Sequence, residues 1–327
     1  MQRIFIRPVI YFLIFNTLLL AAALLGTTVF AETSPTKLVL GTATKGGGFQ
    51  VFGQSLAEVI NATDPSLHVE TIATRGSKQN LPFLEEGKID IGLVEGNAAR
   101  QALEGIGRLR AKLYVLAVMY PNPGMFVVLA DSPYRTIEDL KGHPVAFGTR
   151  ASGLRVLAND VLDGLGLKAD RDFSQVILDK AADGPRLVLK KQVAALWGAG
   201  IGWPGFVKVT DTTASRFIAP SPDEIAKILS KYPHLKKMSV PAGTYHGQEK
   251  QIDSVGLWSL ILVRPDLPDE VVYRLARAIH QGEKVMAKQL KQGAYTTAKN
   301  TVEQIPAARL HPGAATYYRK MGFITNK

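Results

Sequence analysis

The sequence predicts an α/β protein built as two lobes, and three features of the chain support this prediction. Short apolar segments typical of strands alternate with segments whose apolar residues recur at helical spacing. Such alternation is typical of a parallel sheet covered by helices on both faces. The pattern starts again after a turn at Asp131–Pro133, and a chain of 327 residues is long enough for two such units.

The first half of the chain supplies the strands and helices of one lobe. Its predicted strands are Lys37–Leu40, His68–Ala73, Ile89–Leu93, Leu113–Met119 and Met125–Ala130. The first predicted helix carries Phe52, Leu56 and Ile60 on one face, and Asn61–Pro65 ends it because proline cannot continue a helix. A short second helix is predicted at Leu81–Glu86.

The second half repeats this architecture without repeating the sequence. Its predicted strands are Pro144–Gly148, Ser174–Leu178, Val193–Ala199 and Arg216–Ala219. A helix follows the first of these strands, with Leu154, Leu157 and Val161 on one face. The long apolar run Val255–Arg264 is suited to crossing back between the lobes. We therefore expect lobe 1 at residues 33–128 plus 255–327, and lobe 2 at residues 129–254.

A last long helix is predicted to begin near Pro268. The residues predicted for its buried face are Val271, Val272, Leu275, Ala278, Ile279, Val285 and Met286. This helix belongs to the part of the chain that returns to lobe 1.

The N-terminus has the features of an export signal. Arg3 and Arg7 precede the almost wholly apolar run Val9–Val29, and Val29–Ala31 offers the small residues that signal peptidase requires. Residues 1–31 are therefore predicted to be a signal peptide, which places the mature chain in the periplasm. The alternative is an uncleaved membrane anchor, because the apolar run is nearly long enough to span a bilayer.

The composition indicates a folded globular protein and excludes several classes of site. Hydrophobic residues make up 46% and charged residues 20% of the chain. Because there is no cysteine, disulfides, thiolate nucleophiles, cysteine-ligated zinc and a cysteine lipid anchor are excluded. The net charge of +11 comes from Lys and Arg residues spread along the chain, and no nucleic-acid-binding motif accompanies them. Nucleic acid is therefore not an expected partner.

The most informative motif is Gly41–Phe49, which lies between the first predicted strand and the first helix. Its glycines allow backbone N–H groups to approach a ligand, and the helix N-terminus adds a partial positive charge. The candidate ligand-binding residues here are Lys45, Gly46, Gly47, Gly48 and Phe49. The motif lacks the residue order of a phosphate-binding loop and the spacing of a dinucleotide-binding loop. The alternative is a flexible turn.

A second junction of this kind, Gly148–Gly153, occupies the matching place in the second lobe. Arg150 and Ser152 are its candidate ligand contacts, although Ser152 is also suited to capping the helix that follows. Two helix N-termini at the carboxyl ends of strands in two lobes would face a common cleft. An anion held between them would be gripped from both sides and would favour closure of the lobes.

Other polar and aromatic candidates follow the remaining strands of the same predicted edge. They are Arg75, Asn80, Glu95, Asn97 and Tyr120. Arg75 is suited to a bidentate contact with a carboxylate, or is an exposed and solvated side chain. Trp203 is a candidate cleft wall together with Trp197, and either tryptophan would also suit the core.

The sequence does not predict an enzyme. The histidines show no zinc-protease spacing, and no serine lies in a nucleophile elbow. No catalytic residue, metal ligand or cofactor is predicted.

The chain resembles the TAXI family, the solute receptors of one branch of TRAP transporters. The resemblance runs from about Leu38 to Phe323 and rests on the order and spacing of several short motifs. These are Leu40–Phe49 with Gly53–Ala57, Thr74–Leu81, Gly87–Val94, Ile137–Gly142 with Gly148 and Ser152-Gly153, Pro241–Gln248, and Leu310–Arg319.

The resemblance implies a type II periplasmic-binding-protein fold whose two lobes are joined by a hinge. It also implies a small anionic solute, such as a carboxylate or amino acid, as the ligand. The implied partners are TRAP membrane subunits powered by an ion gradient, and a monomer is expected. Carried over by position, the ligand contacts are Gly46–Phe49, Asn80, Asn97, Tyr120 and Ser152. The alternative function is a membrane-anchored sensory or regulatory protein that binds a ligand.

Overall fold

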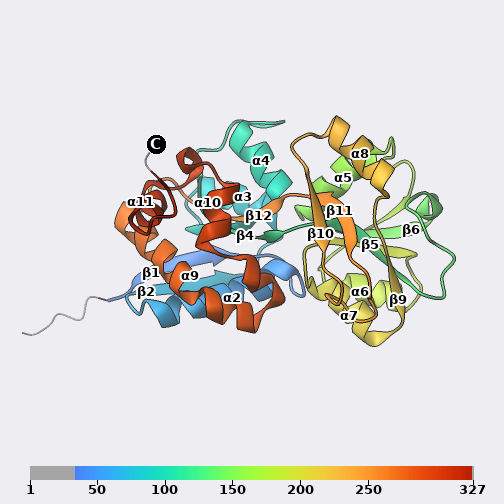
Figure 1. Cartoon of the computed structure of the whole chain (residues 1–327), viewed down its shortest axis with the longest axis horizontal. Helices are drawn as coiled ribbons and strands as arrows, with labels where there is room; N and C mark the ends of the chain where they lie inside the picture. The colour runs from blue at the N-terminus through green and yellow to red at the C-terminus, as the bar shows by residue number, and fades with distance from the viewer. Residues whose placement is uncertain (1–33, 326–327) are drawn as a thin grey trace, which may run out of the picture. The chain divides into compact units, whose positions relative to one another are not determined.

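The computed structural model describes residues 34–325, so the predicted signal peptide lies outside the described residues. The described chain forms two α/β lobes, each built on its own five-stranded sheet (Figure 1). This confirms the predicted fold class. Within this part of the chain, no helix combines the length and apolar character needed to cross a membrane.

The first lobe contains both ends of the described chain. Its first part comprises β1 (Thr36–Gly41), α2 (Gly48–Thr63), β2 (Leu67–Ile72), α3 (Ser77–Glu85), β3 (Ile91–Val94), α4 (Gly96–Glu104) and β4 (Tyr114–Pro121). The returning chain adds β12 (Trp258–Val263), α9 (Asp269–Gln289), η2 (Lys291–Tyr295), α10 (Ala298–Gln304), η3 (Ala307–Arg309) and α11 (Pro312–Lys320). The strands lie in the order β2-β1-β3-β12-β4, and Leu40 of β1 pairs with Thr71 on one side and Ile91 on the other.

The second lobe is formed by one continuous stretch of chain. Its elements are β5 (Gly124–Leu129), η1 (Glu138–Leu140), β6 (Pro144–Thr149), α5 (Leu154–Gly164), β7 (Ser174–Leu178), α6 (Asp183–Leu189), β8 (Ala195–Ala199), α7 (Pro204–Thr212), β9 (Ser215–Ile218), α8 (Pro222–Lys231), β10 (Lys236–Val240) and β11 (Ile252–Gly256). The main sheet has the order β7-β6-β8-β5-β9, and β10 pairs with β11 in a separate ribbon.

The sheets are mixed, which corrects the expectation of parallel sheets. β12 runs antiparallel to β3 and β4, and β5 runs antiparallel to β8 and β9. These two strands enter their lobe directly from the other lobe, without a crossover helix. Because parallel neighbours need such a crossover, a strand that arrives straight across the cleft runs against the others.

The two crossings between the lobes lie side by side. One is Asn122-Pro123 between β4 and β5, and the other is Leu257 between β11 and β12. The Asn122 backbone N–H donates to the Leu257 carbonyl at 3.0 Å, and its side-chain amide donates to the Ser259 hydroxyl at 2.6 Å. A Cβ on Gly256 would lie 1.9 Å from the Asn122 carbonyl oxygen, so the close approach requires glycine. The first crossing precedes residue 124, so β5 belongs to the second sheet. The expected boundary at residue 128 had instead placed most of this strand in lobe 1.

Two predicted elements differ in detail from the structure. The helix predicted from Leu81 begins at Ser77, because its first turn is polar and apolar spacing does not reveal it, although Ser77 and Asn80 in that turn are buried. Val285 was predicted on the buried face of α9 but is 49% exposed, whereas Met286 beside it is buried. The apolar run Val255–Arg264 does cross back between the lobes, as expected, and it comprises the end of β11, the crossing at Leu257 and the whole of β12.

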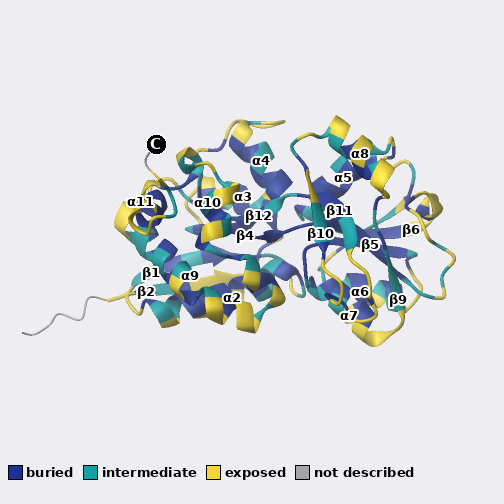
Figure 2. Cartoon of the chain, viewed as in Figure 1, coloured by how far each residue is buried: buried dark blue, intermediate teal, exposed yellow. Residues whose placement is uncertain are grey.

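Burial follows the layers of each lobe. The strands are largely buried and the exposed residues gather on the outer faces of the helices (Figure 2). Both faces of β4 are covered, since seven of its eight residues are buried. The first lobe has one hydrophobic core, and the second has separate cores on the two faces of its sheet.

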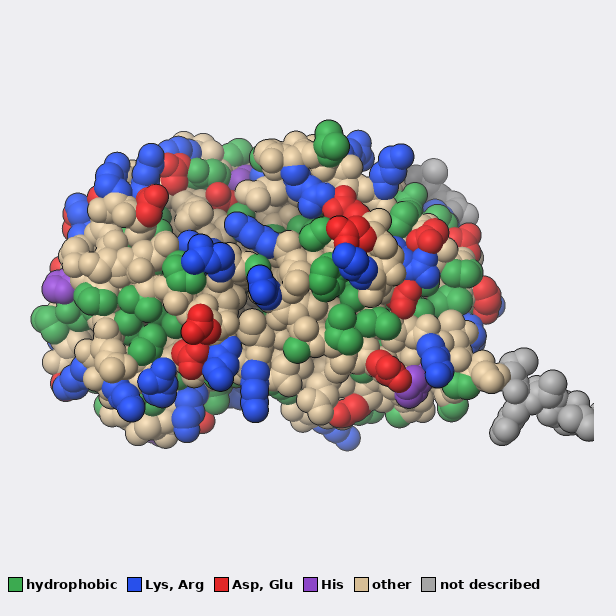
Figure 3. All heavy atoms as spheres, turned by 180° about the vertical axis from the view of Figure 1, so that it is seen from behind, with side chains coloured by type: hydrophobic (Ala, Val, Ile, Leu, Met, Phe, Trp, Pro, Cys, Tyr) green, Lys and Arg blue, Asp and Glu red, His purple; other side chains and the backbone are tan. Residues whose placement is uncertain are grey.

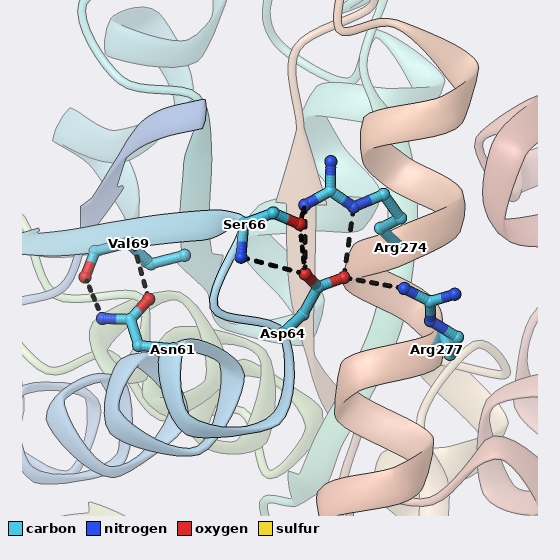
Figure 4. Close-up of polar contacts among 6 residues, drawn as sticks. All are labelled: Asn61, Asp64, Ser66, Val69, Arg274 and Arg277. Carbon is cyan, nitrogen blue, oxygen red and sulfur yellow. Dashed lines mark hydrogen bonds and ion pairs between the residues drawn. The ribbon is translucent and has the colours of Figure 1, made fainter. Parts of the chain in front are cut away.

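A buried ion cluster joins the early and late parts of the first lobe (Figure 4). Asp64, which ends α2, accepts hydrogen bonds from Arg274 at 3.1 Å and from Arg277 at 2.8 Å, both on α9. Ser66 donates to the same carboxylate at 2.6 Å. The hydrogen bond from Arg274 is the main reason that the pKa of Asp64 lies far below its usual range.

We expect Asp64→Asn to lower the free energy of unfolding by about 2–3 kcal/mol, because charged hydrogen bonds are lost and two arginines lose their partner. Since the folded-state pKa of Asp64 is depressed, its stabilisation is present above the unfolded pKa of about 4 and is lost as the pH falls below it. Urea denaturation at pH 7 and pH 3 measures both effects.

The matched control is Asp131→Asn, which breaks an ion pair with Lys191 whose side chains are 65% and 68% exposed. It should change stability by about 0.5 kcal/mol or less. Equal losses in the two variants would contradict a special role for Asp64.

Candidate functional site

A pocket lies between the lobes, at the carboxyl ends of the parallel strands. It is lined by Ala43, Thr44, Gly47, Gly48, Phe49, Arg75, Gly76, Ser77, Glu95, Tyr120, Asn122, Gly148, Thr149, Ser152, Gly153, Leu154, Leu178, Ala181, Trp197, Ala199 and Trp203. The cavity volume is about 60 Å³, counted as the space that the centres of water molecules can occupy. That is room for roughly four to six water molecules, and so for one small solute.

Eight of the thirteen residues proposed from the sequence line this pocket. They are Gly47, Gly48, Phe49, Arg75, Glu95, Tyr120, Ser152 and Trp203. The other five do not line it: Lys45, Gly46, Asn80, Asn97 and Arg150. The pocket therefore gathers residues from both glycine-rich junctions and from the ends of several strands.

The N-terminus of α2 borders the pocket without a side-chain cap. Gly47 occupies the capping position and supplies no side-chain acceptor. Among the described residues, the backbone N–H groups of Gly48 and Phe49 have no hydrogen-bond acceptor. Unsatisfied amides and the helix dipole make this turn a favourable place for a negative charge.

The N-termini of α3 and α5 meet across the cleft. Neither Gly76, before α3, nor Gly153, before α5, provides a side-chain cap. A Cβ on Gly153 would lie 2.4 Å from the Cβ of Glu95 and 2.6 Å from the Ser77 hydroxyl oxygen. The Ser152 hydroxyl accepts a hydrogen bond from the Leu154 N–H at 3.2 Å, so this side chain does help to cap α5.

The N-terminus of α4 is filled by the protein's own carboxyl group. Glu95 is 1% exposed and accepts hydrogen bonds from the backbone N–H groups of Asn97 and Ala98. Burial, with a smaller contribution from the nearby Asp160, raises the pKa of Glu95 to about 8 despite these hydrogen bonds. Glu95 is thus mainly protonated at pH 7 and adds little negative charge to the pocket.

Aromatic side chains form the apolar part of the wall. Trp197 is 1% exposed and its indole N–H donates to the Leu154 carbonyl at 2.9 Å, so it serves both the core and the wall. Trp203 comes from the second lobe and approaches Gly48 of the first. Tyr245 holds this tryptophan in place. Its hydroxyl accepts a hydrogen bond from the backbone N–H of Trp203 and donates one to the Gly200 carbonyl.

The predicted residues outside the pocket wall have other positions. The Asn80 side-chain amide donates to the carbonyls of Gly41, Thr42 and Leu93, which ties α3 to the ends of β1 and β3. Asn97 is buried in the first turn of α4, and its side chain has no hydrogen-bond partner among the described residues. Arg150 is exposed.

Lys45 and Gly46 contact the second lobe directly. The Lys45 carbonyl accepts a hydrogen bond from the Ala182 N–H at 3.2 Å, and Gly46 packs against the same alanine. Beside it, the Thr44 hydroxyl accepts from the Ala181 N–H at 3.1 Å. These contacts join the first glycine-rich loop to the turn before α6.

Two more hydrogen bonds cross between the lobes elsewhere. The Lys78 N–H donates to the Ala151 carbonyl at 3.2 Å, and the Lys291 ammonium group donates to the Thr244 carbonyl at 2.8 Å. The lobes are therefore in contact on several sides of the pocket, which is a closed arrangement.

Several wall residues were not singled out from the sequence. Asn122 lies at the crossing, Leu178 is the last residue of β7, and Ala181 follows β7 in the second lobe. The position of Leu178 and Ala181 at and just after the end of a predicted strand was the signal available for them, since β7 ends at the same edge as β6. Within residues 34–325, no group of His, Asp or Glu side chains is arranged to hold a metal ion.

The chain matches a protein-family model and several solved structures. The model of the NMT1-like family matches residues 40–322. A TctC solute-binding protein from Polaromonas has 17% identity and a TM-score of 0.50, over 90% of this chain and 100% of that one. A Xanthomonas citri protein solved with bound chloride has 16% identity and a TM-score of 0.54, over 88% and 99%. The aliphatic sulphonate-binding protein SsuA from Escherichia coli has 18% identity and a TM-score of 0.46, over 88% and 79%.

We expect Gly153→Ala to open the lobes, because the new methyl group would overlap Glu95 and Ser77 across the cleft. Small-angle X-ray scattering should show a larger radius of gyration than that of the unaltered protein. The control is Asn159→Ala on the exposed face of the same helix, which should leave the scattering unchanged. An unchanged curve for Gly153→Ala would show that the lobes do not close on this contact.

Proposed function

The chain belongs to the NMT1-like family, and on that premise we propose that it is an extracytoplasmic receptor for a small anionic solute. The solute class is a carboxylate or amino acid, held in the pocket between the lobes. The receptor delivers it to the membrane subunits of a TRAP-type transporter and has no catalytic role. The motifs that resemble the TAXI receptors, from Leu40–Phe49 to Leu310–Arg319, support the choice of transporter.

The convergence of helix N-termini on one pocket is the observation that carries the proposal. α2, α3 and α5 all begin at the pocket and come from both lobes, and the glycines at their N-cap positions provide no capping side chain. Each offers the positive end of a helix dipole, and α2 adds the unsatisfied N–H groups of Gly48 and Phe49. An anion between them would be stabilised by both lobes at once, which favours the closed arrangement over an open one.

The ionisable side chains of the wall favour the same class of solute. Arg75 lines the pocket and forms no ion pair with any described residue. Glu95 is the carboxyl group in the wall, and it is mainly protonated at pH 7 because burial raises its pKa to about 8. The pocket therefore presents one free positive charge and little opposing negative charge.

The charge on the face of the molecule shown in Figure 3 does not suggest a large polyanion as the ligand. The face shown in Figure 3 carries Lys and Arg side chains interleaved with Asp and Glu, rather than one continuous basic stripe. A nucleic-acid-binding surface usually gathers its basic residues on one face or groove.

Binding of small carboxylates tests the proposal. The purified chain from Glu32 onwards should show a higher melting temperature with at least one member of a panel of dicarboxylates, amino acids and keto acids, because a ligand that binds only the folded state stabilises it. Arg75→Ala should weaken that binding, and Arg186→Ala, an exposed arginine of α6, should not. A flat response to every member of the panel would contradict the proposal.

The transporter assignment needs a separate measurement. Uptake of the bound solute into cells should stop when the ion gradient is collapsed and should continue when ATP is depleted with the gradient maintained. Uptake that follows ATP instead would contradict a TRAP-type partner while leaving the receptor role in place.

The affinity for a carboxylate without an amino group should fall by up to about tenfold as the pH rises from 7 to 9. The pKa of Glu95 is raised to about 8, so the proton is present below this value and is lost above it, which places a negative charge in the pocket. Glu95→Gln cannot ionise and should bind with the same affinity at both pH values. Isothermal titration calorimetry compares them, and a pH-independent affinity in the unaltered protein would contradict this role.

A further inference from the structure

Gln292 is a buried polar residue that lies behind the residues of the pocket wall. It lies in η2, which follows α9 in the returning part of the chain, and it is 2% exposed. Its side-chain nitrogen has no hydrogen-bond partner among the described residues. Because a buried and unpaired amide is costly, such a group is expected to have a partner under working conditions.

The Gln292 amide is directed at the first turn of α2. A Cβ built on Gly48 would lie 3.5 Å from the Gln292 side-chain nitrogen and 3.1 Å from the Tyr120 hydroxyl oxygen. The Tyr120 hydroxyl is also buried, and it forms no hydrogen bond with the described residues. A methyl group at position 48 would crowd the Tyr120 hydroxyl, so glycine keeps the small space between these groups open.

This space belongs to the pocket between the lobes. Gly48, Tyr120 and Trp203 all line that pocket, and the Trp203 ring edge lies 3.0 Å from the same Cβ position. Trp203 is contributed by the second lobe, whereas the other two come from the first. The space is therefore closed off when the lobes are together.

We propose that Gln292, Tyr120 and the unsatisfied N–H groups of Gly48 and Phe49 form a subsite that recognises a carboxylate of the solute. This inference rests on the proposed receptor function, and it identifies the carboxylate as the group of the solute that the receptor recognises. The subsite joins three separate segments of the chain: the glycine-rich loop, the end of β4 and η2.

The groups at the subsite determine what it accepts. Gln292 offers N–H donors, Tyr120 offers an O–H donor, and α2 offers backbone N–H donors. A carboxylate brings two acceptor oxygens and no donor, so it satisfies several of these groups at once. An ammonium group would instead meet donors and the positive end of the α2 dipole.

The test compares Gln292→Met and Tyr120→Phe with the unaltered protein in titrations with succinate and with L-glutamate. Each substitution keeps the approximate shape of the side chain and removes its polar group. We expect the dissociation constant to rise about 10-fold to 100-fold for Gln292→Met, because a hydrogen bond to a charged group is lost. The matched control is Gln304→Met on the exposed face of α10, which should bind within about twofold of the unaltered protein.

A second measurement follows the Gln292 side-chain amide by NMR in the unaltered protein labelled on glutamine nitrogen. The signals of this amide should shift on saturation with succinate or L-glutamate. This measurement uses the unaltered protein, so it does not depend on whether a substituted protein folds. Unchanged affinity in Gln292→Met, or unchanged Gln292 signals, would overturn the subsite and leave the receptor function standing. If the unaltered protein binds none of the carboxylate panel, the receptor function is overturned together with the subsite.

Discussion

The two adjacent crossings of the chain are the constraint on which the rest of the structure depends. Asn122 hydrogen-bonds to Leu257 and Ser259, so the outgoing and returning strands act as one joint. Each strand enters its new sheet from the cleft side and runs antiparallel to its neighbours. As a result, the carboxyl ends of the parallel strands in both lobes point towards one pocket, where the helices that follow them begin.

The helix N-termini at this pocket are treated in two different ways. The N-terminus of α4 is occupied by Glu95 from the protein itself, whereas α2, α3 and α5 have glycine at the N-cap position and no carboxyl group there. The carboxyl group of Glu95 caps α4, and burial raises its pKa to about 8, so it is mainly protonated at pH 7. The remaining N-termini and Arg75 place positive charge at the pocket, which is the basis for proposing an anionic solute.

Much of the fold and part of the site followed from local patterns in the sequence. Apolar periodicity identified the strands, and glycines between a strand and a helix marked the two junctions at Gly41–Phe49 and Gly148–Gly153. Local patterns do not report strand direction, so the antiparallel β5 and β12 were not predicted. Nor do they report where a side chain points: Asn80 turned inward to bind three carbonyls, and the Lys45 backbone contacts the other lobe. Gln292 had no local signal at all, because η2 reaches α2 only through the tertiary fold.

The position of β12 in the first sheet has a consequence for the order of assembly. It lies between β3 and β4, and it is made only after the whole second lobe has been synthesised. A chain emerging segment by segment from a ribosome or a translocation channel can complete the second lobe first, since that lobe is continuous in sequence. The first sheet must wait with a gap between β3 and β4 until the last seventy or so residues arrive. Its folding therefore depends on contacts of long sequence separation and should be slower than that of the second lobe.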